Sequence, residues 1–172
     1  AARQVLYKLV AVADFLVTND PPTVLAALGM TYDEIAARNP RLIYAHATGY
    51  GEKGPEAEKP GYDATAWWAR SGLMDLVREA GAEPALSMPG MGDHPAAMAL
   101  LSGILLALIQ RERTGKGTKV SSSLMANGVW SNAFLAQAVL CGVSGTPAIS
   151  RTNTPNALAN RYRTRDGRWI FL

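Results

Sequence analysis

The chain has 172 residues, of which 48% are hydrophobic and 18% are charged, and its formal net charge is +3. This composition is typical of a globular protein with a sizeable core and excludes a disordered chain. The basic excess is mild and no zinc-finger or RNA-binding signature accompanies it, so we expect no nucleic-acid partner.

Helical and extended patterns alternate in the first part of the chain. In order, they predict a helix over 3–12, a strand over 14–19, helices over 23–29 and 31–38, and a strand over 41–49. Gly29 is a typical helix C-cap, and Thr31 with Glu34 has the spacing of a capping box. Because helices separate the two apolar strands, we expect an α/β fold with parallel strands.

A loop rich in glycine, proline and charge covers 49–61. The elements expected after it are a helix over 62–73, a polar loop through Pro89, a helix over 93–113, a strand over 118–124 and a helix over 124–142. Trp67 and Trp68 are neighbours in the first of these helices, so we expect one of them at a cleft or an interface. The apolar run 95–109 is shorter than the ~20 residues that cross a bilayer, which predicts a buried core helix and no membrane partner.

The last part of the chain differs in character from the rest. A polar connection over 144–160 leads to a pattern typical of a strand hairpin. We therefore expect a large domain over 1–150, and over 151–172 a linker and the start of a second, small domain. The chain opens inside a helical pattern and ends in an extended one, so we expect a piece of a longer protein.

The cysteine content bears on the compartment. Cys141 is the single cysteine, so no internal disulfide can form. It lies in an apolar helical run, where a buried thiol is expected. Because the sequence has neither a disulfide framework nor a signal peptide, we expect a cytoplasmic protein.

One carboxylate has an unusual setting. Asp93 follows the Pro-Gly-Met-Gly loop of residues 89–92 and opens the longest apolar helix. As an N-cap it would accept backbone N–H bonds, and the helix dipole would favour its anion. Gly90 and Gly92 leave room for a ligand beside the backbone. Asp93 is therefore either a plain helix cap or a nucleophile toward an activated carbonyl group.

Other polar residues carry weaker signals. Asp63 opens the helix over 62–73, where a carboxylate in the first turn is common. Asn19 and Asp20 follow the first strand, at the position where α/β sheets bind ligands. His46 lies in the middle of a strand and is expected to be a hydrogen-bonded core histidine. No spacing typical of metal ligands occurs, so we expect no metal.

Together these segments resemble the class III CoA-transferases, a group that also contains formyl-CoA and carnitine CoA-transferases and 2-methylacyl-CoA racemases. The matching segments occur in family order: "ADFLVTN", "LAALGMTYDEIAARNPRLIYAHATGYGEKGP", "KPGYDATAWWARSGL", "GDHPAAMALLSGILLALIQRERTGKGTKVSSSLMANGV" and "YRTRDGRW". The combination of "WWARSG" with "PGMGDHP" is most similar to the branch that acts on 2-hydroxyacyl-CoA and arylacrylyl-CoA esters.

The resemblance implies a Rossmann-like large domain and the transfer of coenzyme A between an acyl-CoA ester and a small carboxylic acid. Asp93 would attack the thioester to give a mixed anhydride, and CoA thiolate would convert this anhydride to an aspartyl-CoA thioester. The acceptor acid would then resolve the thioester. Asp63 would assist near the acyl group. The resemblance also implies a homodimer.

The implied coenzyme A contacts come from three places in the sequence. Tyr62 matches a CoA-contacting position, Gly92 belongs to the family's Gly-Asp step, and Asn19 with Asp20 matches the CoA-lining loop after a strand.

The sequence also departs from the family pattern. Racemases have a histidine where Tyr62 stands, which argues against racemase activity. The loop 19–22 reads Asn-Asp-Pro-Pro, and Ala27 replaces a common arginine, so the grip on anionic CoA is weaker. These departures leave open an alternative, a non-catalytic module for CoA binding or dimerisation.

Overall fold

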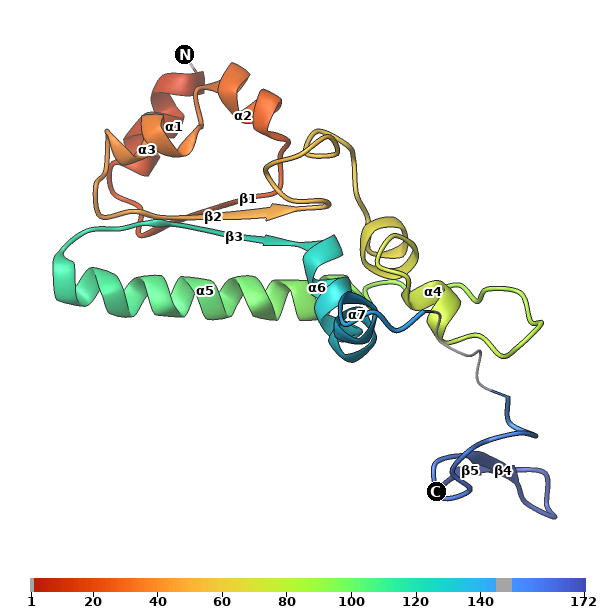
Figure 1. Ribbon diagram of the computed structural model, residues 1–172. Coiled ribbons are helices and arrows are strands. Elements are labelled where there is room, and N and C mark those ends of the chain that lie inside the picture. Colours follow the sequence, from red (N-terminus) through yellow and green to blue (C-terminus); the bar gives the residue numbers. More distant parts are fainter. Residues whose placement is uncertain (1, 145–149) are drawn as a thin grey trace.

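The computed structural model describes residues 2–144 and 150–172 of the chain (Figure 1). Its first elements are α1 (Ala2–Val10), β1 (Phe15–Thr18), α2 (Pro22–Leu28), α3 (Tyr32–Ala36) and β2 (Ile43–Thr48). The middle of the chain forms η1 (Asp63–Ala69), α4 (Leu73–Leu76), α5 (Asp93–Thr114) and β3 (Lys119–Ser123). The last elements are α6 (Leu124–Ser131), α7 (Ala133–Leu140), β4 (Arg161–Arg163) and β5 (Trp169–Phe171).

A parallel sheet in the order β1-β2-β3 lies at the centre of the fold. Helix α5 runs along one face of the sheet, and α1, α2 and α3 lie on the other face (Figure 1). The central strand is the most buried, since Ile43, Tyr44, Ala45 and His46 are almost inaccessible to solvent. The predicted α/β fold, a parallel sheet flanked by helices, is confirmed.

The main core fills the space between the sheet and the helices α1 and α3. It consists of Val10, Ile35, Leu42 and Tyr44. The Tyr44 hydroxyl donates a hydrogen bond of 2.8 Å to the Met30 carbonyl, so the polar end of this buried ring has a partner.

Local signals in the sequence correctly mark the ends of α2 and α3. Gly29 ends α2 in the left-handed conformation, with φ of 71°. Thr31 and Glu34 form the predicted capping box at the start of α3, with both reciprocal contacts present. These motifs depend on residues only a few positions apart, so sequence alone could specify them.

The segment that follows the loop 49–61 forms a π-helix, η1, within the range 62–73 where a helix was expected. Trp67 and Trp68 are both buried and stacked, with ring centroids 5.9 Å apart and an interplanar angle of 15°. The expectation that one of them lines a cleft is therefore wrong. The wider turn of a π-helix reduces the angle between neighbouring side chains, which lets both rings enter one cluster with Leu73.

The long helix expected over 124–142 is divided at Asn132 into α6 and α7. The Asn132 side-chain amide donates a hydrogen bond of 2.8 Å to the Ser71 carbonyl, which ties this junction to the segment after η1. No residue of α7 is buried, and Cys141 just beyond it is exposed. The expectation of a buried thiol is wrong because no described element covers this end of α7.

Helix α5 is buried on one face only. Its buried residues are Leu100, Ala107 and Arg111. Its exposed large apolar residues are Met98, Leu101, Leu105, Leu106 and Ile109. By length and composition α5 could cross a membrane, a test that core helices also pass. The expected buried core helix is thus half-exposed, and the expectation of no membrane partner stays a prediction.

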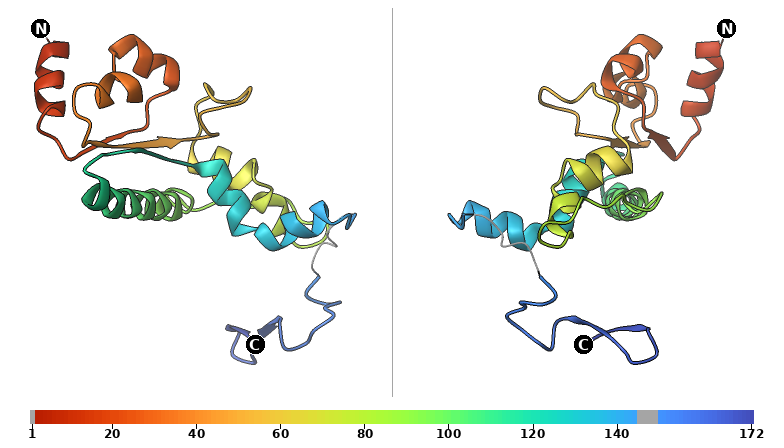
Figure 2. Two further views of the ribbon diagram at one scale, coloured as in Figure 1. Left: turned by 60° about the vertical axis from the view of Figure 1, so that its left-hand side comes forward. Right: turned by 90° about the vertical axis from the view of Figure 1, so that its right-hand side faces the viewer.

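The C-terminal hairpin lies apart from the sheet. Strands β4 and β5 pair antiparallel, as the sequence pattern predicts, and Figure 2 shows them below the helices. The predicted boundary between the domains at residue 150 adjoins residues 145–149, which lie outside the described residues, so the division at this point stays a prediction.

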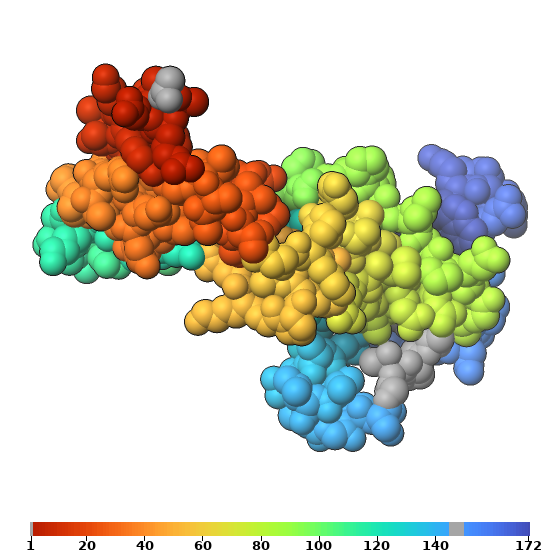
Figure 3. All heavy atoms as spheres, turned by 90° about the horizontal axis from the view of Figure 1, so that it is seen from above, coloured from red at the N-terminus to blue at the C-terminus, as the bar shows by residue number. Residues whose placement is uncertain are grey.

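Seen from above, the block of α1 to α3 and the segment of about residues 50–90 lie side by side (Figure 3).

Candidate active site

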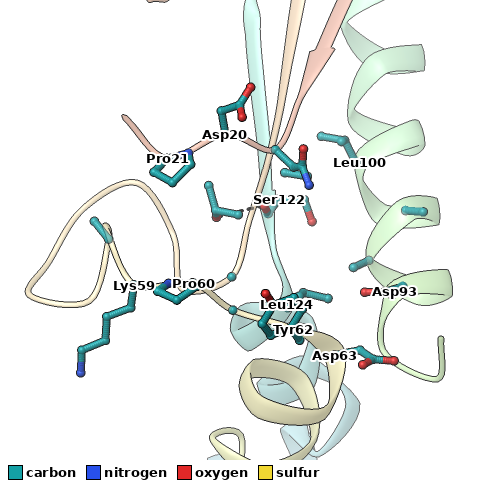
Figure 4. Close-up of a pocket in the computed structure, with 18 of the residues that line it drawn as sticks. Asp20, Pro21, Lys59, Pro60, Tyr62, Asp63, Asp93, Leu100, Ser122 and Leu124 are labelled. Carbon is teal, nitrogen blue, oxygen red and sulfur yellow. Dashed lines mark hydrogen bonds between the residues drawn. The ribbon is translucent and has the colours of Figure 1, made fainter. Parts of the chain in front are cut away.

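A cleft of about 580 Å³ lies at the carboxyl ends of the parallel strands. Its walls come from the loop after β1, the end of β2, the start of η1, the first turns of α5 and the end of β3. Figure 4 shows Asp93 and Asp63 at one end of the cleft and Asp20 with Pro21 at the other. This is the edge at which α/β sheets bind their ligands.

The cleft brings together most of the residues singled out from the sequence. Five of them line it: Asn19, Asp20, Tyr62, Asp63 and Asp93. The sixth, Gly92, is not among its lining residues. It is buried, and a Cβ atom added to it would lie 2.6 Å from Cβ and Cγ of Trp67. In this structure, the missing side chain of Gly92 lets the start of α5 approach η1.

Asp93 is the first residue of α5, whereas an N-cap position was expected. Gly92 occupies the N-cap position and makes no side-chain hydrogen bond. The Asp93 side chain is exposed on the cleft wall, and no hydrogen bond or ion pair within the described residues engages its carboxylate. The helix dipole still favours the anion. A carboxylate in this state keeps its lone pairs available for an incoming electrophile.

Asp63 has the opposite environment. Its Oδ1 accepts a hydrogen bond of 2.6 Å from the Ala64 backbone N–H, and its Oδ2 accepts one of 2.6 Å from the Gly90 N–H. Gly90 has a φ of 78°, a conformation that favours glycine. Asp63 thus ties the glycine loop before α5 to the start of η1, and it uses a backbone donor that would otherwise be available to an oxyanion.

Two glycines bring Tyr62 and Asp63 to the end of β2. A Cβ atom on Gly49 would lie 2.6 Å from the Cα atom of Gly61, so the two ends of the loop 49–61 touch through their backbones. The Tyr62 ring is 69% exposed beside this contact and lines the cleft. The glycine-rich composition predicted a loop, but the contact between its two ends depends on the tertiary structure.

The loop after β1 is held by both of its neighbouring strands. The Thr18 hydroxyl donates to Asp20 Oδ2 at 3.0 Å and accepts from the Asp20 N–H at 3.2 Å. From β2, Nε2 of His46 lies 2.9 Å from the Asp20 carbonyl oxygen. His46 is 1% exposed, which confirms the expected core histidine. Its contact with the cleft loop was missed, because 26 residues separate the two and no local pattern links them.

Charge in the cleft is mostly negative. Its lining includes the carboxylates of Asp20, Asp63 and Asp93 and a single basic side chain, Lys59. Lys59 pairs with Glu56 at 3.1 Å, and the hydrogen bonds from Lys59 and Arg70 lower the pKa of Glu56. No cluster of three or more potential metal ligands occurs among residues 2–144 and 150–172.

Comparison with known proteins gives consistent results. The family model described as CoA-transferase family III matches residues 1–172. The chain is 40% identical over 169 residues to an (R)-2-hydroxy-4-methylpentanoate CoA-transferase of Clostridioides difficile, covering 98% of this chain and 42% of the relative. It is 36% identical over 169 residues to a cinnamoyl-CoA:phenyllactate CoA-transferase of Clostridium sporogenes, covering 98% and 41%.

A crystal structure of a CAIB/BAIF family protein from Brucella suis is similar to the fold. The TM-score is 0.85 at 30% sequence identity, over 98% of this chain and 44% of that one. The chain therefore spans less than half the length of these relatives. The resemblance inferred from sequence, including its branch, is confirmed: the chain belongs to CoA-transferase family III.

Proposed function

We propose that this chain carries the site at which a CoA-transferase exchanges coenzyme A between an acyl-CoA ester and a carboxylic acid, with Asp93 as the covalent nucleophile. One observation carries the proposal: Asp93 presents an exposed carboxylate, without a hydrogen-bond partner in the described residues, to a cleft at the ligand-binding edge of the sheet. Family membership supports acyl-CoA and carboxylic acid as substrates.

The reaction proceeds by acyl exchange on Asp93. A carboxylate oxygen attacks the thioester carbonyl carbon, the C–S bond breaks, and CoA thiolate leaves behind a mixed anhydride. The thiolate attacks the aspartyl carbonyl, the substrate's carboxylate departs, and an aspartyl-CoA thioester remains. The acceptor carboxylate then displaces the thiolate from this thioester, which forms a second anhydride. Attack of the thiolate on the acceptor's acyl carbon releases the new acyl-CoA and restores Asp93.

Asp63 and Tyr62 support this chemistry in different ways. Asp63 holds the Gly90 N–H and so fixes the turn from which Asp93 projects. The exposed Tyr62 ring offers a flat apolar face and a hydroxyl group to the CoA chain. Tyr62 stands where the racemases of the family have a histidine, which disfavours racemisation.

The acyl group is proposed to be branched or aromatic. Ala96, Ala97 and Leu100 lie three, four and seven residues after Asp93 and line the cleft with it, so one face of α5 gives an apolar wall. Small side chains in this wall leave space for a bulky acyl chain. The substrates in the names of the relatives, 2-hydroxy-4-methylpentanoate and cinnamoyl and phenyllactyl groups, have this character.

A second candidate is a CoA-binding or dimerisation module without turnover. The observation in its favour is the charge of the cleft, in which Lys59 is the single basic lining residue beside three aspartates. A cleft with this charge attracts the phosphates of CoA only weakly, which would limit catalysis by this chain even though the Asp93 nucleophile is in place.

The test is to trap the aspartyl intermediate. The chain is mixed with isocaproyl-CoA and cinnamoyl-CoA, treated with hydroxylamine and mapped by peptide mass spectrometry. We expect a hydroxamate at Asp93, and we expect Asp93→Asn to lower transfer by at least about a thousandfold. Asp33→Asn is the matched control, because Asp33 also lies in the first turn of a helix but outside the cleft.

Two results would contradict the nucleophile. One is normal turnover by the Asp93→Asn variant, and the other is a hydroxamate on a different carboxylate. CoA binding by calorimetry without any adduct would instead favour the non-catalytic module.

A further inference from the structure

A buried polar chain lies directly beneath one wall of the cleft, and the proposed reaction does not use it. Its centre is His46 on β2, which is 1% exposed. Nε2 of His46 is 2.9 Å from the Asp20 carbonyl oxygen, and Nδ1 contacts Glu52 Oε1. The same Glu52 oxygen lies 2.6 Å from Lys119 Nζ on β3. The chain of contacts thus crosses two strands and ends at the cleft loop.

The partners of the His46 ring determine where its protons are. A carbonyl oxygen only accepts hydrogen bonds, and an ionised carboxylate also only accepts them. A neutral imidazole carries one N–H, which would leave one ring nitrogen with its lone pair facing an acceptor. Both contacts are satisfied together only when both nitrogens carry a proton. The geometry therefore requires an imidazolium cation at His46, provided that Glu52 is ionised.

Glu52 is held in its ionised form by its surroundings. Burial raises the pKa of Glu52, but the hydrogen bonds and charges of Lys119 and His46 outweigh this effect and leave it below the ordinary value. Lys119 also lies 5.9 Å from the centroid of the Tyr44 ring, so its ammonium group remains close to the chain of contacts.

Polar groups contact both nitrogens of the His46 ring. Glu52 Oε1 contacts Nδ1 and also Lys119 Nζ, and the Asp20 carbonyl oxygen contacts Nε2. Tyr44, on the same strand, packs edge-on at 6.4 Å between ring centroids. Burial raises the pKa of Tyr44 to about 12, with smaller contributions from the charges of Glu52 and Asp20, so its hydroxyl stays neutral.

The contact between His46 and the Asp20 carbonyl oxygen holds one wall of the cleft in place. This wall is formed by Asn19, Asp20, Pro21 and Pro22. Thr18 fixes the N–H and the carboxylate of Asp20, and His46 fixes its carbonyl, so the orientation of the peptide unit before Pro21 depends on the ring. Pro21 and Pro22 have restricted φ angles and carry this orientation along the loop.

We propose that His46, held as an imidazolium by Glu52, is a positioning residue that fixes the loop 19–22 for the coenzyme A part of the substrate. This inference rests on the proposed function for the identity of the ligand.

The isosteric variant Glu52→Gln tests the inference most directly. Its side-chain amide can donate to Nδ1, so a neutral ring protonated at Nε2 satisfies both contacts. We expect this variant to show the neutral ring by ¹⁵N NMR at pH 7 and to keep the wild-type KM for acyl-CoA, because the contact with the Asp20 carbonyl is retained. The wild-type ring should show protons on both nitrogens. Glu58→Gln, in the same loop but outside the chain of contacts, is the control.

Removal of the ring tests the positioning role itself. In His46→Gln, the amide can donate to the Asp20 carbonyl, but its oxygen then faces the Glu52 carboxylate. We expect KM for acyl-CoA to rise about tenfold with kcat within about twofold. The Asp20 amide proton should also exchange faster than in the wild type. The double variant His46→Gln with Glu52→Gln should restore the wild-type KM and the wild-type Asp20 exchange rate, because the side-chain amides of the two glutamines can hydrogen-bond to each other.

The outcomes separate this inference from the proposed function. A neutral wild-type ring at pH 7, or an unchanged Asp20 exchange rate in His46→Gln, would overturn the positioning role. If the wild-type chain binds no acyl-CoA, the proposed function fails, while the ring protonation and the amide exchange still decide whether His46 fixes the loop.

Discussion

Two aspartates at the same end of the cleft have different environments, and this difference separates their roles. Asp63 accepts two short backbone hydrogen bonds, from Ala64 and Gly90, whereas no described residue engages the Asp93 carboxylate. A carboxylate whose lone pairs are occupied holds backbone in place, and one that faces open space can attack a substrate. At the scale of residues, the function therefore depends on which carboxylate keeps its lone pairs available.

Tyr44 gives a prediction at this scale. Burial raises its pKa to about 12, whereas a tyrosine in an unfolded chain has a pKa of about 10. The folded state binds this proton more tightly, so its contribution to stability is full below pH ~10 and is lost as pH rises toward 12. An absorbance titration should show one of the six tyrosines ionising last.

The control for this prediction is Tyr44→Phe. It should remove the late transition and flatten the high-pH loss of stability. It should also cost about 1 kcal/mol at neutral pH, because the Met30 carbonyl loses its donor. A uniform titration of all tyrosines near pH 10 would contradict the burial of this hydroxyl.

At the scale of elements, close backbone contacts between segments shape the site. Gly92 lets the start of α5 touch Trp67 of η1, and Gly49 touches Gly61 at the base of the loop that leads to Tyr62. These contacts place the ends of β2, η1 and α5 around one cleft. The glycines matter here through the side chains they lack.

Gly92→Ala should therefore disturb both stability and activity. The new Cβ would lie 2.6 Å from Trp67, so the start of α5 must shift, at a cost of about 1–3 kcal/mol. Urea unfolding measures the cost, and the rate of acyl transfer should fall because Asp93 moves with the helix.

Gly103→Ala on the same helix is the matched control. Its Cβ would have only ordinary contacts with Val120, so higher helix propensity should stabilise the protein by up to about 1 kcal/mol. Equal stability changes for the two variants would contradict the tight contact at Gly92.

At the scale of the whole molecule, much apolar surface is exposed. On the outer face of α5 it includes Leu101, Leu105 and Leu106, and on α6 and α7 it includes Trp130 and Phe134. Large exposed apolar patches are typical of protein interfaces. A homodimer, which the family resemblance implies, would cover such surface.

We expect the chain to self-associate at micromolar concentration. Sedimentation velocity should show a sedimentation coefficient that rises with concentration, and the double variant Leu105→Glu with Leu106→Glu should lower it toward the value of a monomer. The variant Gln110→Glu, at an exposed position on the same helix, is a control for added negative charge. A wild-type chain that stays monomeric throughout would contradict an interface on α5.

The sequence by itself determined the local structure and the family. The order of strands and helices from α1 to β2, the Gly29 cap and the capping box of Thr31 and Glu34 were correct, because each depends on residues close together in the chain. The motifs also identified five of the residues that line the cleft, since the polar residues after parallel strands meet at one edge of the sheet.

Only the tertiary structure decided how these residues are held. The π-helical turn buries both Trp67 and Trp68, which an α-helical pattern excludes. The bond from Asp63 to Gly90 spans 27 residues, and that from His46 to Asp20 spans 26. Contacts over such distances depend on the packing of whole elements against one another, and local sequence patterns carry no information about that packing.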